Sequence, residues 1–186
     1  MQVHKSISDN ELIERITSGE EDLFEEIINR YQGAVATTTM NMLCDAEDSA
    51  EVGQQVFIQV YRSLARFRKQ SSLKTYITRI AINHCINFLK RRKNFFGRSY
   101  ELNKARNVRI KSEANQFEYK ELLNQAFQNL DDKHRSVIVL RMIQGYSTIE
   151  TAEILDVPKG TVLSRLARGM DKLKIILEEE LKYEHQ

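Results

Sequence analysis

The sequence predicts an all-α protein made of two small helical domains. Apolar residues recur every three or four positions along much of its 186 residues, which is the spacing of one helix face. A single proline and seven glycines leave long stretches without helix-ending residues. No stretch of useful length alternates as a strand would. Residues 94–114 lose the periodicity and are rich in Asn, Lys, Arg and Ser, so we expect a flexible basic linker over 94–115.

The N-terminal domain, residues 1–93, is expected to contain five helices. Ser8 and Glu11 have the capping-box spacing that opens a short first helix. In the fourth helix, Val52 begins a row of apolar residues at i+4 spacing that extends to Leu64. The helices after the first are predicted over about 23–31, 33–43, 48–64 and 73–92.

The C-terminal domain, residues 116–186, is expected to contain a helix-turn-helix. Ser147 and Glu150 repeat the capping-box spacing before a short helix. Pro158 would end that helix, Gly160 would permit the turn, and Thr161 would cap the next helix. The four predicted helices cover about 119–130, 137–143, 148–155 and 161–180, the second of them stopping at Gly145.

Charge is distributed unevenly, although the formal net charge of the whole chain is only +2. Residues 62–111 hold 15 basic residues and 1 acidic residue, whereas residues 1–61 hold 3 basic and 12 acidic residues. Between Glu51 and Glu101 there is no acidic residue. Such a basic middle attracts a polyanion, and nucleic acid is the one we expect. On charge alone, a solvated basic linker and a membrane-surface patch remain alternatives.

Composition argues against several classes of protein. The four histidines are scattered, and we find no glycine-rich phosphate loop, nucleophile elbow or metal-ligand spacing. We therefore expect no enzymatic activity, no cofactor and no metal. Cys44 and Cys85 stand alone and are expected to be buried, reduced thiols. No apolar run could span a bilayer and the polar N-terminus is no signal peptide. We expect a cytoplasmic protein without membrane insertion that is monomeric when free.

Two sets of motifs resemble those of bacterial sigma factors of the extracytoplasmic-function class. The C-terminal set is DKHRSVIVLR from Asp132, GYS from Gly145, AEIL from Ala152 and PKGTVLSRL from Pro158. The N-terminal set is LFEEIINRY from Leu23, DAEDSAE from Asp45, QVFIQVYRSL from Gln55 and FRKQSSLKTYITRIAIN from Phe67. The resemblance covers about 20–92 and 118–178, in the order and spacing of the second and fourth regions of the family.

The resemblance implies that the second region binds the clamp of the largest subunit of core RNA polymerase and melts the minus-ten promoter element. The implied polymerase-binding residues are Asp48, Glu51, Gln54, Gln55, Ile58 and Gln59. A loop over about 69–73 would hold a flipped base. Arg79, Asn83 and Asn87, at i+4 spacing, form a polar stripe that suits a single strand. The implied minus-ten residues are Ser71, Ser72, Leu73, Tyr76, Arg79, Asn83, Asn87, Lys90 and Arg91.

The resemblance also implies that the helix-turn-helix reads the minus-thirty-five element in the major groove. The residues for that role are Lys159, Thr161, Ser164, Arg165 and Arg168. The linker would pass near the RNA exit path of the polymerase, and an anti-sigma factor would mask the polymerase-binding surfaces. Nothing in the sequence identifies that partner.

Several positions depart from the family pattern. Tyr76 stands where tryptophan is common, Gln55 where glutamate is usual, and Thr151 and Asp156 where isoleucine and glycine are expected. Leu163 replaces a frequent basic residue, and it either contacts a thymine methyl group or packs inside. These departures leave the promoter sequence open.

Two other functions fit the sequence less well than that of a sigma factor. A stand-alone helix-turn-helix regulator would leave the basic fifth helix and its loop without a role. An adaptor that binds only protein would not explain the acid-free stretch.

Overall fold

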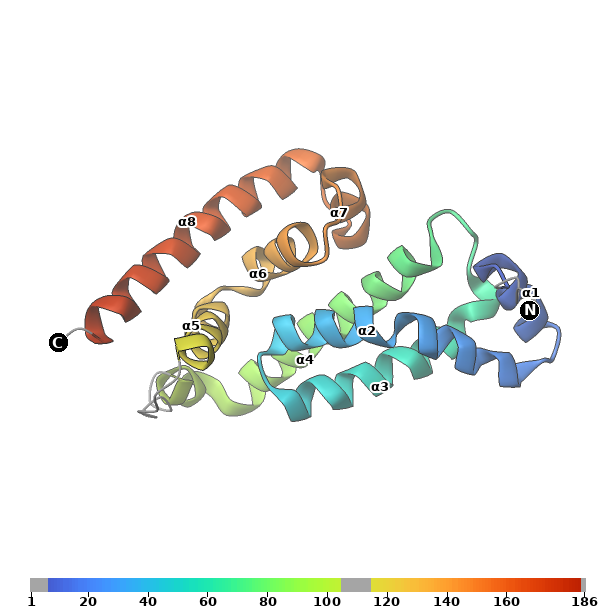
Figure 1. The fold of residues 1–186 in the computed structure, drawn as a ribbon, viewed down its shortest axis with the longest axis horizontal. Coiled ribbons are helices and arrows are strands. Elements are labelled where there is room, and N and C mark those ends of the chain that lie inside the picture. The colour runs from blue at the N-terminus through green and yellow to red at the C-terminus, as the bar shows by residue number, and fades with distance from the viewer. Residues whose placement is uncertain (1–6, 105–114, 185–186) are drawn as a thin grey trace.

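The computed structural model describes residues 7–104 and 115–184, which contain helices and no strand. This confirms the predicted all-α class. In Figure 1, α1 to α4 form one bundle, and α5 to α8 lie along one side of it. The N-terminal helices are α1 (Asp9–Thr17), α2 (Phe24–Leu43), α3 (Ala46–Ser63) and α4 (Leu73–Lys104). The C-terminal helices are α5 (Asn115–Asn129), α6 (Asp132–Ile138), α7 (Thr148–Leu155) and α8 (Lys159–Glu184).

Three shorter segments complete the described secondary structure. Two are single 3-10 turns, η1 (Glu21–Leu23) and η2 (Leu64–Arg66). The third, η3 (Val139–Ile143), is a π-helical segment that extends α6. It ends before Gly145, whose φ of 73° provides the predicted stop.

Side-chain caps explain where several helices begin. Asp45 accepts a hydrogen bond from the Asp48 N–H at 2.9 Å, and Asp131 accepts one from the His134 N–H at 3.2 Å. Ser147 and Glu150 form the complete capping box that their spacing predicts. These bonds satisfy N–H groups that have no partner inside a helix, and a cap of this kind contributes about 1 kcal/mol.

Two predicted helix boundaries in the N-terminal half were wrong. The helices expected over 23–31 and 33–43 form the single helix α2. Gly33 does not interrupt α2, because a glycine in a helix costs only about 1 kcal/mol and the buried face continues at Val35 and Met42. The helix expected to end near Arg92 continues to Lys104. The expected linker therefore begins within α4, and its residues 105–114 lie outside the described residues.

The turn of the helix-turn-helix also differs from its prediction. The left-handed residue is Asp156, with a φ of 52°, and it serves as the C-cap of α7. Its short polar side chain tolerates this conformation better than most residues do. Because α8 begins at Lys159, Gly160 and Thr161 lie in its first turn. Thr161 is therefore not the N-cap.

The N-terminal core lies between α2, α3 and α4, and α1 closes one end of it. Val52, Val56 and Val60 of α3 are at most 1% exposed, as their spacing predicts. Leu12 of α1 and Ile77 of α4 face the same core. Burial of such side chains contributes about 1.5–3 kcal/mol each.

The C-terminal helices pack closely around α8. A Cβ atom at Gly169 would lie 3.1 Å from both His134 Cβ and Ile138 Cδ1, so α6 and α8 approach closely where glycine has no side chain. Val162 packs with Val137 and with Ala152, the small residue at the crossing of α7 and α8.

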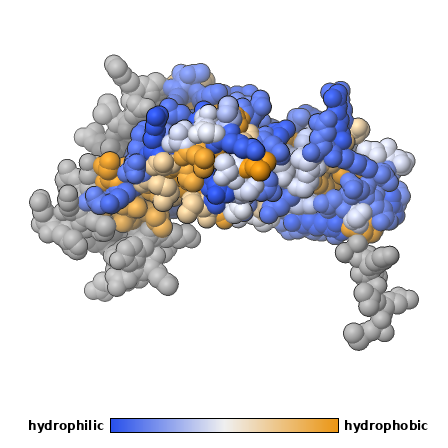
Figure 2. All heavy atoms as spheres, turned by 90° about the horizontal axis from the view of Figure 1, so that it is seen from above, coloured by the Kyte–Doolittle hydropathy of each residue, from blue (hydrophilic) through white to orange (hydrophobic). Residues whose placement is uncertain are grey.

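The two halves of the chain also pack against each other. The largest cluster of buried apolar residues includes Ile77 of α4 together with Leu140 and Tyr146 of the C-terminal half. On the face shown in Figure 2, hydrophobic residues form small groups among hydrophilic ones. No described helix is both long enough and apolar enough to cross a membrane.

Candidate polymerase and nucleic-acid interfaces

The six residues predicted to bind polymerase share the outward side of α3, and we call them the α3 surface. Five of them are exposed, and Asp48 is half-buried. Ile58 is 52% exposed although it is a large apolar residue. The opposite side of α3 lies in the core through Val56 and Val60, and Phe57 packs partly against that core. Apart from Asp48, the α3 surface is therefore not needed for the packing of its own bundle.

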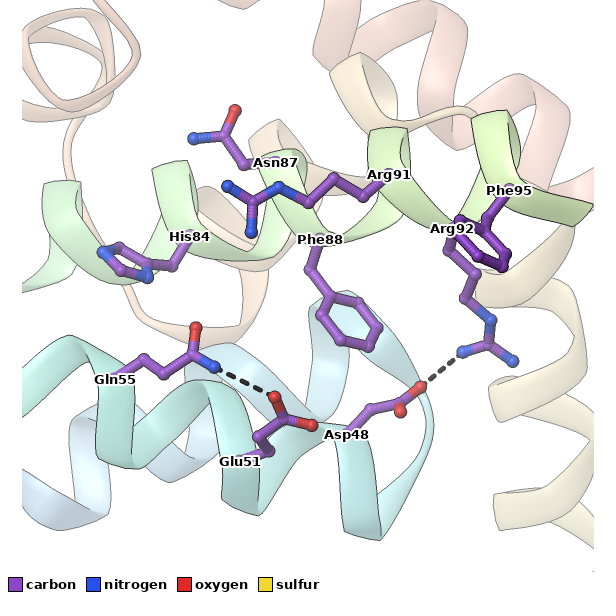
Figure 3. A pocket seen from close by; sticks show the side chains of 9 residues that line it. All are labelled: Asp48, Glu51, Gln55, His84, Asn87, Phe88, Arg91, Arg92 and Phe95. Atoms are coloured by element: carbon purple, nitrogen blue, oxygen red, sulfur yellow. Dashed lines mark hydrogen bonds and ion pairs between the residues drawn. The ribbon is translucent and has the colours of Figure 1, made fainter.

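A groove of about 700 Å³ lies between α3 and α4, on the side away from the core (Figure 3). Its wall on α3 is formed by Asp48, Glu51 and Gln55, and its wall on α4 by His84, Asn87, Phe88, Arg91, Arg92 and Phe95. An ion pair between Arg92 and Asp48 lies at one end, and the Gln55 amide donates to Glu51 at 2.9 Å. The groove thus brings predicted polymerase-binding residues next to two predicted minus-ten residues, Asn87 and Arg91.

The electrostatics of this groove favour a polar partner with an apolar contact. Burial chiefly, and then the neighbouring carboxylates, raise the pKa of Asp48, while the Arg92 guanidinium opposes the shift. Burial and the nearby Arg91 lower the pKa of His84, which keeps its imidazole neutral near pH 7. The Phe88 ring points from α4 into the groove (Figure 3). The groove therefore combines carboxylates on one wall, guanidiniums on the other and an aromatic surface between them.

The predicted polar stripe on α4 is largely accessible, and we call Arg79, Asn83, Asn87, Lys90 and Arg91 the α4 stripe. All of these residues except Arg79 are exposed. The Arg79 guanidinium is half-buried and donates to the Glu153 carbonyl of α7 at 2.6 Å. Ile77 and Ala81, on the other side of the helix, are at most 1% exposed.

The other predicted minus-ten residues lie in the loop before α4 and in the first turn of α4, and several of them support the fold. The Ser72 hydroxyl accepts from the Thr75 N–H at 3.1 Å, so Ser72 caps the start of α4. Leu73 is only 2% exposed and lies in the core. Tyr76 donates to the Ser63 hydroxyl at 2.7 Å. These contacts position the loop, whereas Asn83 lies on the exposed middle of α4, away from this cap.

The tip of the loop has an unusual backbone and a tie to α1. Lys69 has a φ of 54°, which is rare for a residue with a long side chain. Its ammonium group pairs with the Glu14 carboxylate of α1 at 2.6 Å. The Phe67 ring lies 4.8 Å from the Tyr76 ring, centroid to centroid. Sequence reasoning missed the role of Glu14 because the two partners are 55 residues apart.

The predicted minus-thirty-five residues lie in the first three turns of α8, and we call them the α8 surface. Lys159, Ser164 and Arg168 are exposed, and Thr161 and Arg165 are half-buried. Leu163 is 56% exposed, so it does not pack inside. Val162 and Leu173 face the core instead. The first two turns of α8 therefore present basic and hydroxyl groups with Leu163 as an accessible apolar side chain among them.

A polar cluster, of which His134 is the buried member, holds α8 against α6. His134 is 4% exposed, and its Nδ1 lies 2.9 Å from the Asp131 carboxylate, which also accepts from the Lys172 ammonium at 2.9 Å. Burial opposes the charge on Asp131, but the bonds from Lys172 and His134 outweigh it and lower the pKa of this carboxyl. The sequence contained one signal for this cluster, an Asp placed as an N-cap before an apolar run.

Comparison with known families identifies both halves of the chain. Residues 27–95 match sigma-70 region 2, and residues 126–174 match sigma-70 region 4. The ECF RNA polymerase sigma-E factor of Haemophilus influenzae is 30% identical over 181 residues, which cover 91% of this chain and 95% of the relative. The chain belongs to the extracytoplasmic-function RNA polymerase sigma factors. The ECF RNA polymerase sigma factor SigW of Bacillus subtilis is 27% identical to this sigma factor. The aligned region covers 87% of this chain and 92% of the relative.

Solved structures share the fold of this sigma factor. CnrH in complex with the cytosolic domain of CnrY has a TM-score of 0.64 at 24% identity, covering 90% of this chain and 96% of that one. RpoE of Bartonella quintana in complex with the anti-sigma factor NepR has a TM-score of 0.62 at 20% identity, covering 83% and 96%.

The region matches contain all three surfaces. The α3 surface and the α4 stripe lie within the region 2 match, and the α8 surface lies within the region 4 match. Arg135, which sequence reasoning treated only as part of a motif, is 2% exposed and donates to three main-chain carbonyls. Glu14 lies outside both matches.

The cysteines and the other titratable groups suggest no second site. Cys85 is fully buried, and burial raises its pKa to about 12, while Cys44 is half-buried. Within residues 7–104 and 115–184, no group of three His, Cys, Asp or Glu side chains could hold a metal ion.

Proposed function

We propose that this sigma factor directs promoter-specific initiation through its three surfaces. The α3 surface binds the clamp of core RNA polymerase, the α4 stripe and the loop before it engage the opened minus-ten element, and the α8 surface reads the minus-thirty-five element. The corresponding units are residues 1–93, the linker 94–115, and residues 116–186. The observation that carries the proposal is that each surface is exposed on the side of its helix opposite the core.

The α3 surface suits a protein partner better than nucleic acid. It carries two carboxylates, which repel phosphates, and amides that bond to a partner's polar groups. Ile58 supplies an exposed apolar centre within this polar rim, which is the usual arrangement of an interface anchor.

The α4 stripe suits a single DNA strand. Its amides can bond to base edges, and its cations can neutralise phosphates. The stripe itself contains no carboxylate that would repel them. Opening the duplex costs a few kcal/mol for each unstacked base, so surfaces that bind the separated strand drive melting.

The requirement for polymerase also distinguishes this proposal from that of a stand-alone regulator. A regulator that needs only duplex DNA gives no role to Ile58 or to its polar neighbours on α3. We further propose that the protein acts in the cytoplasm as a monomer when free, catalyses no reaction itself, and is controlled by an anti-sigma factor. The complex of the structurally similar RpoE with NepR supports the last point.

Replacing Ile58 with aspartate tests the polymerase surface. A charge at this anchor is expected to weaken binding to bacterial core RNA polymerase at least about tenfold, because an unpaired carboxylate would be desolvated in the interface. Fluorescence titration of labelled protein against core polymerase measures the change. Ile175→Asp is the matched control, since Ile175 is 54% exposed on α8. If both variants lose the same amount of polymerase affinity, or if Ile58→Asp loses none, the α3 surface does not bind polymerase.

Leu163 is expected to contact a thymine methyl group in the minus-thirty-five element, because it is the accessible apolar side chain beside Ser164. Leu163→Ala should weaken duplex binding by the holoenzyme about three- to tenfold. Replacing the contacted thymine with deoxyuridine removes only the methyl group and should have the same effect. Combining the two changes should add nothing further. If the loss of affinity from Leu163→Ala adds fully to the loss from deoxyuridine at every thymine, then Leu163 contacts none of those methyl groups.

A further inference from the structure

Helix α1 is held firmly against the N-terminal bundle. Leu12 and Ile13 are at most 4% exposed and lie in the core. At the start of α1, the Asp9 carboxylate pairs with Arg30 of α2 at 3.1 Å and accepts from the Tyr31 hydroxyl. Because α1 is fixed along one face and at one end, a side chain on its outward face starts from a defined position.

The loop before α4 passes close to α1 (Figure 1), and an ion pair connects the two segments. The Glu14 carboxylate of α1 lies 2.6 Å from the Lys69 ammonium at the tip of the loop. The neighbouring cation on α1, Arg15, donates instead to Glu20 at 2.9 Å. Residues 52–100 contain no aspartate or glutamate, so the carboxylate that meets this loop comes from a distant part of the chain.

The tip of the loop depends on its contacts, because its backbone conformation is disfavoured. Lys69 has a φ of 54°, which glycine adopts readily but a residue with a long side chain rarely does. On one side of the tip Phe67 packs on Tyr76, with ring centres 4.8 Å apart, and on the other side Ser72 caps α4. Between these two anchors, the pair with Glu14 ties the tip to a different helix.

The tip lies immediately before two residues of the proposed minus-ten site. Ser71 is half-buried and Ser72 is exposed, and both follow Lys69 within three residues. The proposed function gives this loop the task of holding a base taken out of the DNA stack. Such a site distinguishes bases only when its walls keep their shape as the base enters. A residue that fixes the tip therefore affects base selection without touching DNA.

The ion pair contributes little to the stability of the whole fold, because the Lys69 and Glu14 side chains are 42% and 69% exposed. Its consequence is local to the loop. An ammonium beside a carboxylate also attracts a DNA phosphate less than a free ammonium does, since the carboxylate repels the phosphate. The pairing therefore favours Lys69 as part of the frame of the loop over Lys69 as a phosphate contact.

We propose that Glu14 is a positioning residue of the minus-ten site: by holding Lys69, it fixes the tip of the loop in the shape that selects the extruded base. The inference rests on the proposed function of the α4 stripe and of the loop before it. It extends the site to α1, which lies outside the region 2 match. Neither Glu14 nor Lys69 contacts the base.

Glu14→Gln tests the inference, because it keeps the size of the side chain and removes its charge. Holoenzyme formed from core RNA polymerase and the full chain is mixed with DNA duplexes whose internal bubble has a randomised sequence, and the bound DNA is sequenced. At the bubble position where the wild type discriminates most, the preference for the best base over the worst should fall about two- to fivefold. Lys69→Gln should reduce it by the same factor, and combining the two changes should add nothing further.

Glu11→Gln is the matched control, since it removes the same charge from an exposed position of α1 one turn earlier. It should leave base discrimination at the wild-type value. Unchanged discrimination in Glu14→Gln would overturn the inference, and so would equal losses in Glu14→Gln and Glu11→Gln or fully additive losses in the double variant. If the wild-type holoenzyme prefers no base at any position of the bubble, the proposed function itself fails.

The salt dependence of binding separates a positioning role from a DNA contact. Each phosphate of a single strand that a cation neutralises adds about 0.7 to the slope of log affinity against log salt concentration. Because Glu14 occupies Lys69, the slope measured with Lys69→Gln holoenzyme on the same bubble DNA should equal that of the wild type. A shallower slope would show that Lys69 contacts a phosphate, and the positioning role of Glu14 would then be wrong.

Discussion

Replacing Arg165 and Arg168 together with alanine is expected to lower promoter-dependent run-off transcription at least about 30-fold, while binding to core polymerase stays unchanged. Both residues lie on the α8 surface, and neither contributes to the core of α8, which is formed by Val162 and Leu173. An arginine that contacts a base edge or phosphate contributes about 1–3 kcal/mol, so the loss of two such contacts reduces promoter occupancy by about 30-fold or more.

The control for this variant must remove the same charge from elsewhere in region 4. Lys133→Ala with Lys174→Ala removes two exposed cations and leaves the α8 surface intact. General attraction to DNA falls equally in both variants, so only the loss of specific contacts separates them. Transcription that falls equally in the two variants would mean that α8 contributes charge alone and does not read the promoter.

Replacing Arg135 with alanine is expected to lower the free energy of unfolding by about 3 kcal/mol. Arg135 is 2% exposed and donates to the carbonyls of Met42, Gln128 and Leu130. Each buried acceptor left without a partner costs about 1–3 kcal/mol, and the lost side chain leaves a cavity. For a chain of this length the midpoint of thermal unfolding should fall by about 6–12 °C.

Two further substitutions define the origin of that loss. Arg135→Lys keeps a cation but not the planar fork that reaches several carbonyls, so it should recover only part of the stability. Arg62→Ala, at an exposed position of α3, should change the unfolding free energy by less than about 0.5 kcal/mol. Circular dichroism melts measure all three variants. A melt of Arg135→Ala that matches the wild type would contradict the anchoring role.

The fold class and the helix-turn-helix followed from local signals. Periodicity located the buried face of α3, and the Ser147–Glu150 spacing located the start of α7. The sequence predicts two helices, over 23–31 and 33–43, whereas α2 is continuous because its buried face continues at Val35 and Met42. The position of the turn was missed because Asp156 takes the left-handed conformation that glycine usually provides.

The candidate surfaces could be predicted from helical phase, but the contacts between distant segments could not. Exposure of Ile58 follows from its place on α3 opposite the core. By contrast, burial of Leu73 depends on how the loop enters α4, and the bond from Arg79 to Glu153 joins residues 74 positions apart. Such contacts arise from tertiary packing, which leaves no periodic pattern in the sequence.

Run-off transcription with bacterial core RNA polymerase tests the central claim most directly. Core polymerase is incubated with a library of promoter fragments, with and without the full chain, and the transcripts are sequenced. The account predicts discrete transcripts that require the protein and come from fragments sharing two sequence elements. Duplex binding by the protein alone, with no transcript that depends on it, would contradict the account and favour a stand-alone regulator.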